Sequence, residues 1–550
     1  MVKLNNKGFA ISGILYAILI LFVVLLLGTL SVLASNKFLL DKTKNELLNS
    51  LNNEEPLNLI LEYDEISYPL NYSGEIDFLD GVTAYDNNGN ELKAGLIGYD
   101  TNLNLNEYGT YMIKYTATKG NLTAEAIRII KVVYTNPSIN GANPELSKGM
   151  IPIVRNGTEW VKADIFSNWY DYNARKWANA VLVTDETRDY YKELGPSNPI
   201  KEDDVLAYLV WIPRYKYKLF NTDSLSSSIQ TIEVVFENKE TPKSDGRVGE
   251  DIQTEQPQNG NYMTHPAFTF GDSELNGFWV GKFETTGTQT NPTVKPNSIS
   301  LTNQNIKDQF LTSRLFNDKL VYGLELDEDA HMMKNTEWGA VAYLSQSYYG
   351  KYGNPIYTGA LGLEKEIYIN NVNSYITTGN GPGVTGCAGD SINATMVRKE
   401  ACPEGYEYYT SQGVKASTTG NVYGIYDMNG GSWEYTMGGM FNSDNTTISI
   451  SNSGFFKDNI DSLAMSKYID KYKYGTTYND QAAYNRSILG DATGETRGWN
   501  GDSVLFVDPS YSWFPRGGYY GGVAASGIFG FNHRTGAMGE NGTFRVVISY

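Results

Sequence analysis

The chain has very few of the side chains that most often carry chemistry: two cysteines, Cys387 and Cys402, and three histidines, His265, His331 and His533. No histidine has the spacing to a cysteine that a zinc site requires. No Ser-His-Asp set can be assigned around three isolated histidines. An even cysteine count in an exported chain favours one disulfide, which would stabilise the fold by roughly 3 kcal/mol. Two buried free thiols are the alternative.

Positive charge is also scarce. Lys and Arg number 44 against 62 Asp and Glu, so the formal net charge is −18, and charged residues make up only 19% of the chain. A chain without a basic surface cannot neutralise phosphates, which excludes nucleic acid as a partner. The 41 tyrosines and 55 glycines favour an extracellular binding surface, although most of the tyrosines are expected to fill strands.

The amino terminus contains a long uncharged run, residues 9–34. As a helix this run would be about 39 Å long, enough to cross the roughly 30 Å hydrocarbon core of a bilayer. Lys3 and Lys7 precede it and would keep the amino terminus cytoplasmic. Leucines at helical spacing extend the predicted membrane-spanning helix over residues 9–53. The alternative is a signal peptide that is cleaved after Ala34.

Lys7-Gly8-Phe9 before this run resembles the leader of type IV prepilins. The resemblance implies that residues 1–8 are a leader, cut between Gly8 and Phe9, and that the partners include other pilins. Gly13 stands where that family has Glu. Loss of this carboxylate fits a minor pilin at a pilus tip and equally fits a plain membrane anchor.

Residues 56–135 have the pattern of a small antiparallel β domain. Val82 to Tyr85 is a strand candidate, and Tyr111, Ile113 and Tyr115 alternate with polar residues as a half-buried strand requires. The segment resembles the bacterial immunoglobulin-like repeats of surface proteins, which implies a stalk that acts as a spacer. A ligand-binding role for the stalk is the alternative. Residues 136–149 are a linker by composition.

The most informative motif is residues 424–436, Gly-Ile-Tyr-Asp-Met-Asn-Gly-Gly-Ser-Trp-Glu-Tyr-Thr. It resembles a signature of the formylglycine-generating-enzyme (sulfatase-modifying-factor) family, which has a C-type-lectin-like fold; Gly431, Ser432 and Tyr435 depart from that signature. Further pieces follow in the family's order at residues 277–286, 335–343, 516–518 and 542–547. The resemblance implies a lectin-like head over residues 150–550.

The resemblance does not extend to the family's oxidase activity. The enzymes carry two copper-binding cysteines after the Arg-Gly-Gly, and here the stretch from Tyr519 to Arg534 contains no cysteine. Without a thiolate there is no soft metal ligand and no redox nucleophile. We therefore expect a binding protein without a cofactor, with calcium left open because lectin-like folds often hold it.

The segment between Gly518 and Gly542 alternates small, aromatic and polar residues around turn glycines. This arrangement is similar to the variable proteins of diversity-generating retroelements, in which a rigid scaffold tolerates varied exposed side chains. We therefore predict a ligand-binding face made of Tyr519, Tyr520, Val523, Ala524, Ser526, His533, Arg534, Ala537, Met538 and Glu540.

Together these patterns predict a multidomain chain with a transmembrane α-helix, an all-β immunoglobulin-like sandwich and an α+β C-type-lectin-like head. The predicted function is an adhesin or minor pilin tip at the cell surface, with an extracellular head that binds an unknown protein or carbohydrate ligand. An enzyme of another kind on the same fold and a structural pilus subunit are the alternatives.

Overall fold

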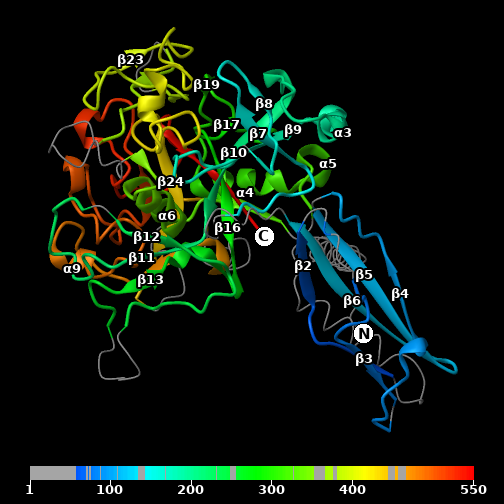
Figure 1. The fold of residues 1–550 in the computed structure, drawn as a ribbon. Coiled ribbons are helices and arrows are strands. Elements are labelled where there is room, and N and C mark those ends of the chain that lie inside the picture. The colour runs from blue at the N-terminus through cyan, green and yellow to red at the C-terminus, as the bar shows by residue number, and fades with distance from the viewer. Residues whose placement is uncertain are drawn as a thin grey trace, which may run out of the picture. The chain divides into compact units, whose positions relative to one another are not determined.

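A computed structural model gives the fold (Figure 1). It describes residues 57–550 apart from 70–71, 73–75, 87, 108, 134–142, 168, 231, 248–255, 326–327, 352–365, 376–380, 444–451 and 456–465. The predicted leader, its cleavage site between Gly8 and Phe9, and the predicted helix over residues 9–53 lie outside the described residues.

The chain divides into two compact units, which are described separately. The first runs through Ser67, Ser73–Asn104 and Tyr111–Lys131; the second holds Tyr68–Tyr72, Leu105–Thr110 and Val132–Tyr550.

The first unit is built from two small β-sheets. One pairs β1 (Asn58–Leu61) with β3 (Val82–Tyr85). The other has the order β2 (Glu65–Pro69), β6 (Leu122–Val133), β5 (Gly109–Lys119), β4 (Ile97–Thr101), and a 3-10 turn, η1 (Ala94–Leu96), precedes β4. Alternate residues of β5 are buried, as the sequence predicts. Its buried Tyr115 donates to the carbonyl of Phe78 at 2.7 Å and accepts from Arg128, which is also buried.

A seven-stranded sheet is the largest element of the second unit. Its order is β20 (Asp329–Met332), β28 (Val546–Ser549), β16 (Gly277–Gly281), β10 (Val205–Pro213), β9 (Asn179–Val183), β7 (Met150–Arg155), β8 (Trp160–Lys162). β10 is a nearly continuous apolar run and is buried along almost its whole length. Trp211 of β10 packs against Trp279 of β16, with ring centroids 5.3 Å apart. Residues 150–213 therefore share one sheet with the last strand of the chain.

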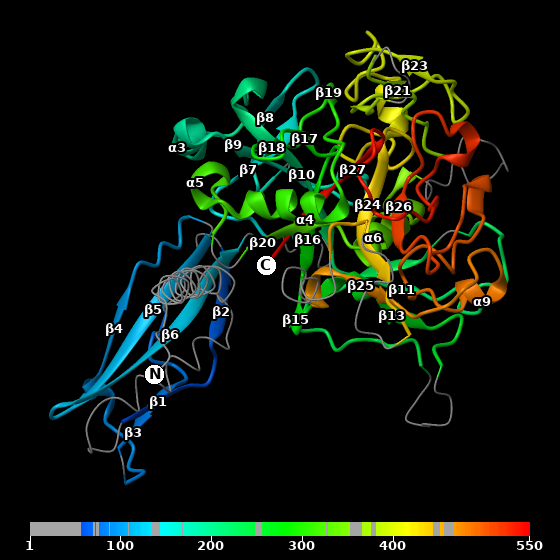
Figure 2. The same ribbon diagram turned by 180° about the vertical axis from the view of Figure 1, so that it is seen from behind.

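The second large sheet of this unit carries the candidate site. It consists of β25 (Asp470–Tyr472), β24 (Trp433–Met440), β26 (Trp513–Arg516) and β27 (Gly542–Phe544). β24 pairs antiparallel with β26 and parallel with both β25 and β27 (Figure 2).

The remaining strands of the unit form small sheets. They are β12 (Val234–Phe236), β11 (Tyr215–Lys218) and β13 (Tyr262–Thr264); β14 (Thr269–Phe270) with β15 (Ser273–Glu274); β17 (Thr286–Gly287) with β18 (Pro292–Thr293); β19 (Ser298–Ile299) with β22 (Val384–Thr385); and β21 (Val372–Asn373) with β23 (Val397–Arg398).

Helices are few and short in the described residues. They are α3 (Asp185–Glu193), α4 (Ile306–Arg314), α5 (Lys319–Tyr322), α6 (Asn335–Gln346) and α9 (Gln481–Tyr484), with 3-10 turns η2 (Glu202–Asp204), η3 (Pro266–Phe268), η4 (Leu315–Asn317), η7 (Gly413–Ala416), η8 (Ser466–Tyr468), η9 (Trp499–Gly501) and η10 (Val523–Ala525). α6 is buried along its whole length and lies beside β24 (Figure 1). Its first turn is capped by Glu337, which accepts a 2.7 Å hydrogen bond from the backbone N–H of Lys334.

The fold class predicted from the sequence is wrong. The described residues form a multidomain, predominantly β protein with few helices, and the head is β-rich where an α+β domain was expected. The reason is that short apolar runs bounded by Gly, Asn and Ser form strands and turns. Among the described residues no helix is both long and apolar enough to cross a membrane.

Candidate ligand-binding face

The motif at residues 424–436 leads into the strand that carries the site. Gly430 and Gly431 have φ values of 83° and 64°, in the left-handed region that glycine adopts most readily, and they reverse the chain immediately before β24. Ile425 and Tyr426 are buried but form no strand. The motif is therefore a tight loop that enters β24, and the strand's partners come from β25, β26 and β27 far away in sequence.

An aromatic pair lies at the amino-terminal end of β24. The ring of Tyr519 stacks on that of Trp433, with centroids 6.2 Å apart and planes inclined by 20°. The backbone N–H of Trp433 donates to the carbonyl of Asn541 at 2.8 Å, which holds the returning chain against the same residue. Tyr435 is two residues further along β24 and so points to the same side of the strand as Trp433.

The predicted site residues divide by exposure. Ala524, Arg534, Met538 and Glu540 are exposed, and Tyr519, Val523 and Ala537 are partly buried. These seven are referred to below as the carboxy-terminal face. Trp433 and Tyr435 are buried, at 8% and 7% exposure. Trp433 contacts the face through the Tyr519 ring, and Gly542 lies against the Tyr435 ring.

Three predicted contact residues are buried, so their assignment to an exposed face is corrected. Tyr520 is 0% exposed, Ser526 1% and His533 8%. The Tyr520 hydroxyl donates to the carbonyl of Gly381 at 2.5 Å, and its backbone N–H donates to the carbonyl of Gly431 at 2.7 Å. The Ser526 hydroxyl closes a local loop, since it donates to the carbonyl of Tyr519 at 2.9 Å and accepts from that residue's N–H. Tyr520 and Ser526 therefore hold the segment in place.

His533 belongs to a separate cluster. Its Nδ1 lies 3.1 Å from Oδ2 of Asp508, and its ring packs against Tyr478 and Tyr511 with centroids 5.1 and 4.8 Å away. Burial lowers the pKa of His533, although the neighbouring Asp508 carboxylate opposes the shift. Both tyrosines are more than 40% exposed, and nothing in the sequence pattern associates them with His533.

A buried ion pair supports the face from below. Glu434, between Trp433 and Tyr435, points to the opposite side of β24 and receives two hydrogen bonds from Arg545, at 2.9 Å from Nε and 2.5 Å from Nη2. The guanidinium also donates to the carbonyls of Gly281 at 2.7 Å and Tyr426 at 2.9 Å. One arginine thus joins β24 to β16 and to the entry loop.

Two further carboxylates lie near this pair. Glu284 accepts from the Ser432 N–H at 2.7 Å, and Asp427 accepts from the Asn370 side chain at 2.6 Å. Burial raises the pKa of Glu284 well above its usual value, and the charges of Asp427 and Glu434 raise it further. Burial also raises the pKa of Glu434 to about 6, while Arg545 acts in the opposite direction. The motif residues that match the family signature are thus buried framework.

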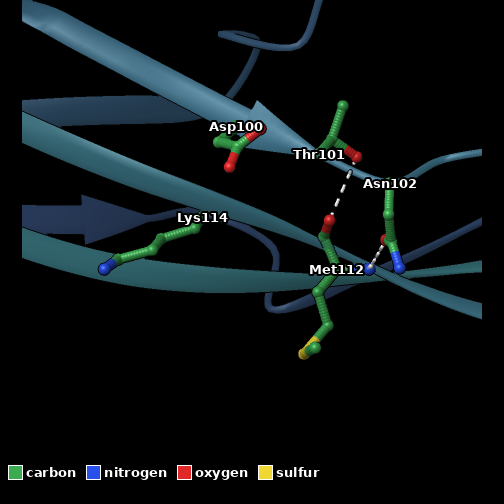
Figure 3. Close-up of a pocket in the computed structure, with 5 residues that line it drawn as sticks. All are labelled: Asp100, Thr101, Asn102, Met112 and Lys114. Carbon is green, nitrogen blue, oxygen red and sulfur yellow. Dashed lines mark hydrogen bonds between the residues drawn. The ribbon is translucent and has the colours of Figure 1, made fainter.

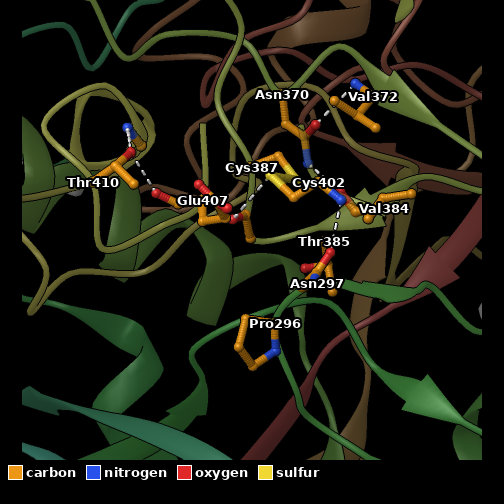
Figure 4. The surroundings of a disulfide bond; sticks show 12 residues. Pro296, Asn297, Asn370, Val372, Val384, Thr385, Cys387, Cys402, Glu407 and Thr410 are labelled. Carbon is orange, nitrogen blue, oxygen red and sulfur yellow. Dashed lines mark hydrogen bonds between the residues drawn. A yellow bond between two sulfur atoms is a disulfide. The ribbon is translucent and has the colours of Figure 1, made fainter. Parts of the chain in front are cut away.

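A disulfide-closed loop brings a further charged residue to this region. Cys387 and Cys402 are joined by the disulfide that the sequence predicts, with Cα atoms 5.7 Å apart (Figure 4). The loop that they close contains β23, whose Arg398 is paired in register with Asn373 of β21. Burial raises the pKa of Tyr520, and the charges of Arg398 and Glu540 act on its hydroxyl in opposite directions. The position of Arg398 opposite Asn373 depends on pairing between strands that are distant in sequence.

The described residues contain no group of three or more His, Cys, Asp or Glu side chains that could hold a metal ion. The other two histidines are fully buried. His331 lies 3.0 Å from Glu337, and Nδ1 of His265 accepts from the backbone of Ala267 at 3.3 Å.

A pocket of about 240 Å³ lies on the first unit, lined by Asp100, Thr101, Asn102, Met112 and Lys114 (Figure 3). Thr101 and Asn102 already hydrogen-bond the backbone of Met112, and Lys114 pairs with Glu125 at 2.9 Å. This pocket is a hollow at the sheet edge whose polar groups are largely satisfied, and it does not point to a ligand.

No protein-family model matches the chain, and no curated protein matches it at a significant level. Among solved structures, the M60 catalytic domain with two CBM51 domains from Clostridium perfringens ZmpB matches at 11% identity and a TM-score of 0.13, covering 30% of this chain and 16% of that one. The CBM51-2 domain in complex with GlcNAc, with the INT domains of the same protein, matches at 9% identity and a TM-score of 0.13, covering 32% and 38%. A lipoprotein from Bacteroides thetaiotaomicron matches at 14% identity and a TM-score of 0.14, covering 41% and 92%.

This chain therefore spans 16% to 38% of the length of these two ZmpB structures. At such TM-scores the superpositions do not establish a shared fold, and they carry no argument about a ligand.

Proposed function

We propose that the chain is a ligand-binding protein displayed at the cell surface, and that the carboxy-terminal face of its head contacts the ligand. The observation that carries the proposal is the partly exposed ring of Tyr519, which stacks on the buried Trp433 in a segment whose Ala524, Arg534, Met538 and Glu540 side chains are exposed. Large aromatic rings with few rotatable bonds give contact area at low entropic cost, and Tyr, Trp and Arg are enriched at binding hot spots.

Rigid support favours the same proposal. Tyr519 is fixed at its backbone by Ser526, and Trp433 is fixed by Asn541 and followed by the buried Glu434–Arg545 pair. A face that is already ordered before binding loses less entropy when the ligand arrives. The Cys387–Cys402 disulfide favours a location outside the reducing cytoplasm.

The test compares binding of the full-length chain with that of two tyrosine variants on printed arrays of glycans and of extracellular proteins. Tyr519→Ala removes the stacked ring from the face. Tyr190→Ala is the matched control, because Tyr190 lies on α3 and is 59% exposed. We expect Tyr519→Ala to weaken every specific signal and Tyr190→Ala to leave it unchanged. Equal binding by both variants, or no binding to either array, would show that the face is not a recognition site.

A further inference from the structure

Two exposed tyrosine rings pack against the buried ring of His533. Tyr478 is 46% exposed and Tyr511 is 43% exposed, and their ring centroids lie 5.1 and 4.8 Å from that of His533. Neither tyrosine hydroxyl has a hydrogen-bond partner among the residues that the structure describes. These three residues are called the His533 cluster below. Its two tyrosines each present an apolar ring and a polar hydroxyl at the surface.

Hydrogen bonds fix the backbone that carries these rings. Asp508 and Tyr511 close a turn, in which each backbone N–H donates to the carbonyl of the other residue at 3.1 Å. The carbonyl of Tyr478 accepts from the N–H of Phe506 at 2.9 Å. The Asp508 carboxylate also lies 3.1 Å from Nδ1 of His533. The two exposed rings are therefore ordered before a ligand arrives, which lowers the entropic cost of binding.

A positive charge adjoins the His533 cluster. Arg534 follows His533 directly, is exposed, and is a member of the carboxy-terminal face. Its Nη1 donates to the carbonyl of His533 at 3.2 Å and to the Asn532 side chain at 3.1 Å. Asp480, two residues beyond Tyr478, is engaged in capping α9. Within the described part of the chain the guanidinium forms no ion pair with a carboxylate, and its Nε and Nη2 donors have no partner.

Backbone groups around the cluster are already paired, which disfavours a peptide that adds to the protein as a strand. Arg534 and Trp513 exchange two backbone hydrogen bonds, at 2.9 and 3.0 Å. The N–H groups of Ser510 and Tyr511 donate to Oδ1 of Asp508, at 2.6 and 3.1 Å. Strand addition requires free N–H and C=O groups along an edge. A ligand here therefore meets side chains: two tyrosine rings with their hydroxyls, and a guanidinium.

We propose that Tyr478, Tyr511 and Arg534 bind an acidic saccharide, with a sugar ring against the tyrosines and its carboxylate or sulfate group on the guanidinium. The inference rests on the proposed function and names the ligand class at the Arg534 end of the carboxy-terminal face. A guanidinium only donates hydrogen bonds, and it binds an anionic group through two parallel bonds. A tyrosine offers an apolar ring to the C–H face of a sugar, and its hydroxyl both donates and accepts.

The experiment measures binding of the full-length chain to an array of paired oligosaccharides beside acidic unglycosylated peptides. Each oligosaccharide is printed with its sialic acid or sulfate and again without it, so the two arms tell which anion the site takes. Binding is expected on the acidic member of a pair. Arg534→Gln, Tyr478→Ala and Tyr511→Ala are each expected to weaken it about tenfold or more, because each removes a charge-assisted hydrogen bond or a ring contact.

Matched controls separate lost contacts from lost structure. Arg247→Gln and Tyr190→Ala change exposed residues in other segments and should bind as the wild type does. Arg534→Lys keeps the charge without the forked geometry, so its affinity should lie between those of the wild type and Arg534→Gln. Melting temperatures of all the variants are compared with that of the wild type, and unchanged values show that the head is folded.

Three outcomes would overturn the inference: equal binding to the acidic and neutral members of a pair, retention only on the peptides, or wild-type binding by Arg534→Gln or by both tyrosine variants. Failure of this inference can be told apart from failure of the proposed function. Binding that depends on Tyr519 and not on Arg534 would refute the acidic saccharide and keep the proposed function. Binding that depends on neither residue, or no binding at all, would refute both.

Discussion

Removal of Arg545 is expected to destabilise the head more than any substitution on the carboxy-terminal face. Arg545→Met keeps much of the side-chain volume and removes the guanidinium. It leaves the Glu434 carboxylate buried without its partner, and it also leaves the Gly281 and Tyr426 carbonyls without their donor. Breaking a buried ion pair from one side costs about 3–5 kcal/mol.

The double variant Glu434→Gln/Arg545→Met separates the charge from the packing. It removes both charges, so the uncompensated carboxylate disappears, and we expect it to recover about half of the loss. Full recovery is not expected, because Asp427 and the two carbonyls also lose a favourable neighbour. In the single variant Glu434 can avoid its charge by taking up a proton, so the destabilisation should be smaller at pH 5 than at pH 8.

The assay is denaturant unfolding of the full-length chain, followed by tryptophan fluorescence. All nine tryptophans lie after residue 150, so the signal reports the head. Arg247→Met is the control, because its partner Asp245 is exposed and surface pairs contribute little. The reasoning would be refuted by a loss below about 1 kcal/mol for Arg545→Met, or by a double variant no more stable than the single one.

Three further predictions follow from the same structure. Tyr520→Ala should lower the free energy of unfolding by about 3–5 kcal/mol, because the ring is fully buried. Tyr519→Ala should change the melting temperature little and affect binding alone. Equal melting temperatures for the two variants would contradict this ranking. Replacing Cys387 and Cys402 together by Ser should cost about 3 kcal/mol in thermal unfolding, because the bridge closes a loop of the head; an unchanged melting temperature would contradict this. Burial raises the pKa of Glu495 to about 7. The proton on this carboxyl therefore stabilises the fold fully below pH 4.5, and as the pH rises through about 7 up to about 3 kcal/mol of that stability is lost. The prediction would be refuted by a Glu495→Gln variant whose stability falls between pH 5.5 and 8.5 as steeply as that of the wild type.

The sequence predicts local structure well where the pattern itself is local. The strand at Val82–Tyr85 and the alternation from Tyr111 to Ala117 agree with the structure, because burial on one face of a strand leaves a period of two. Residues 335–343, one of the pieces that carry the family resemblance, lie in α6, and the two cysteines pair as predicted.

The candidate site could be predicted only in part, because its side chains are placed by partners far away in sequence. Tyr520 is buried by a bond to Gly381, and His533 by Asp508 and two tyrosines, so neither position can be recognised as buried from its own segment. Arg398 likewise lies opposite Asn373 only because β23 pairs with β21. The prediction of the fold class was wrong for a similar reason. A resemblance between short motifs predicts the local structure of each motif, and it does not predict how many strands pack around it.

Because β24 lies between β26 and β27, it affects how well the segment that connects β26 to β27 tolerates changes in length. Glu434 of β24 is opposite Arg516 of β26 on one side and Thr543 of β27 on the other. The segment from Gly517 to Asn541, which connects β26 to β27, therefore begins and ends beside the same residue of β24. When the ends of a loop are already held together, lengthening the loop adds little to the entropic cost of closing it. This cost rises by only about 0.6 kcal/mol for each doubling of loop length. Insertions directly after the exposed Met538 should therefore add little closure cost, provided that Gly539 and Asn541 keep the hydrogen bonds that their carbonyls accept from Asn303 and Trp433. The turn is then a place where new recognition sequences can be introduced without redesign of the head.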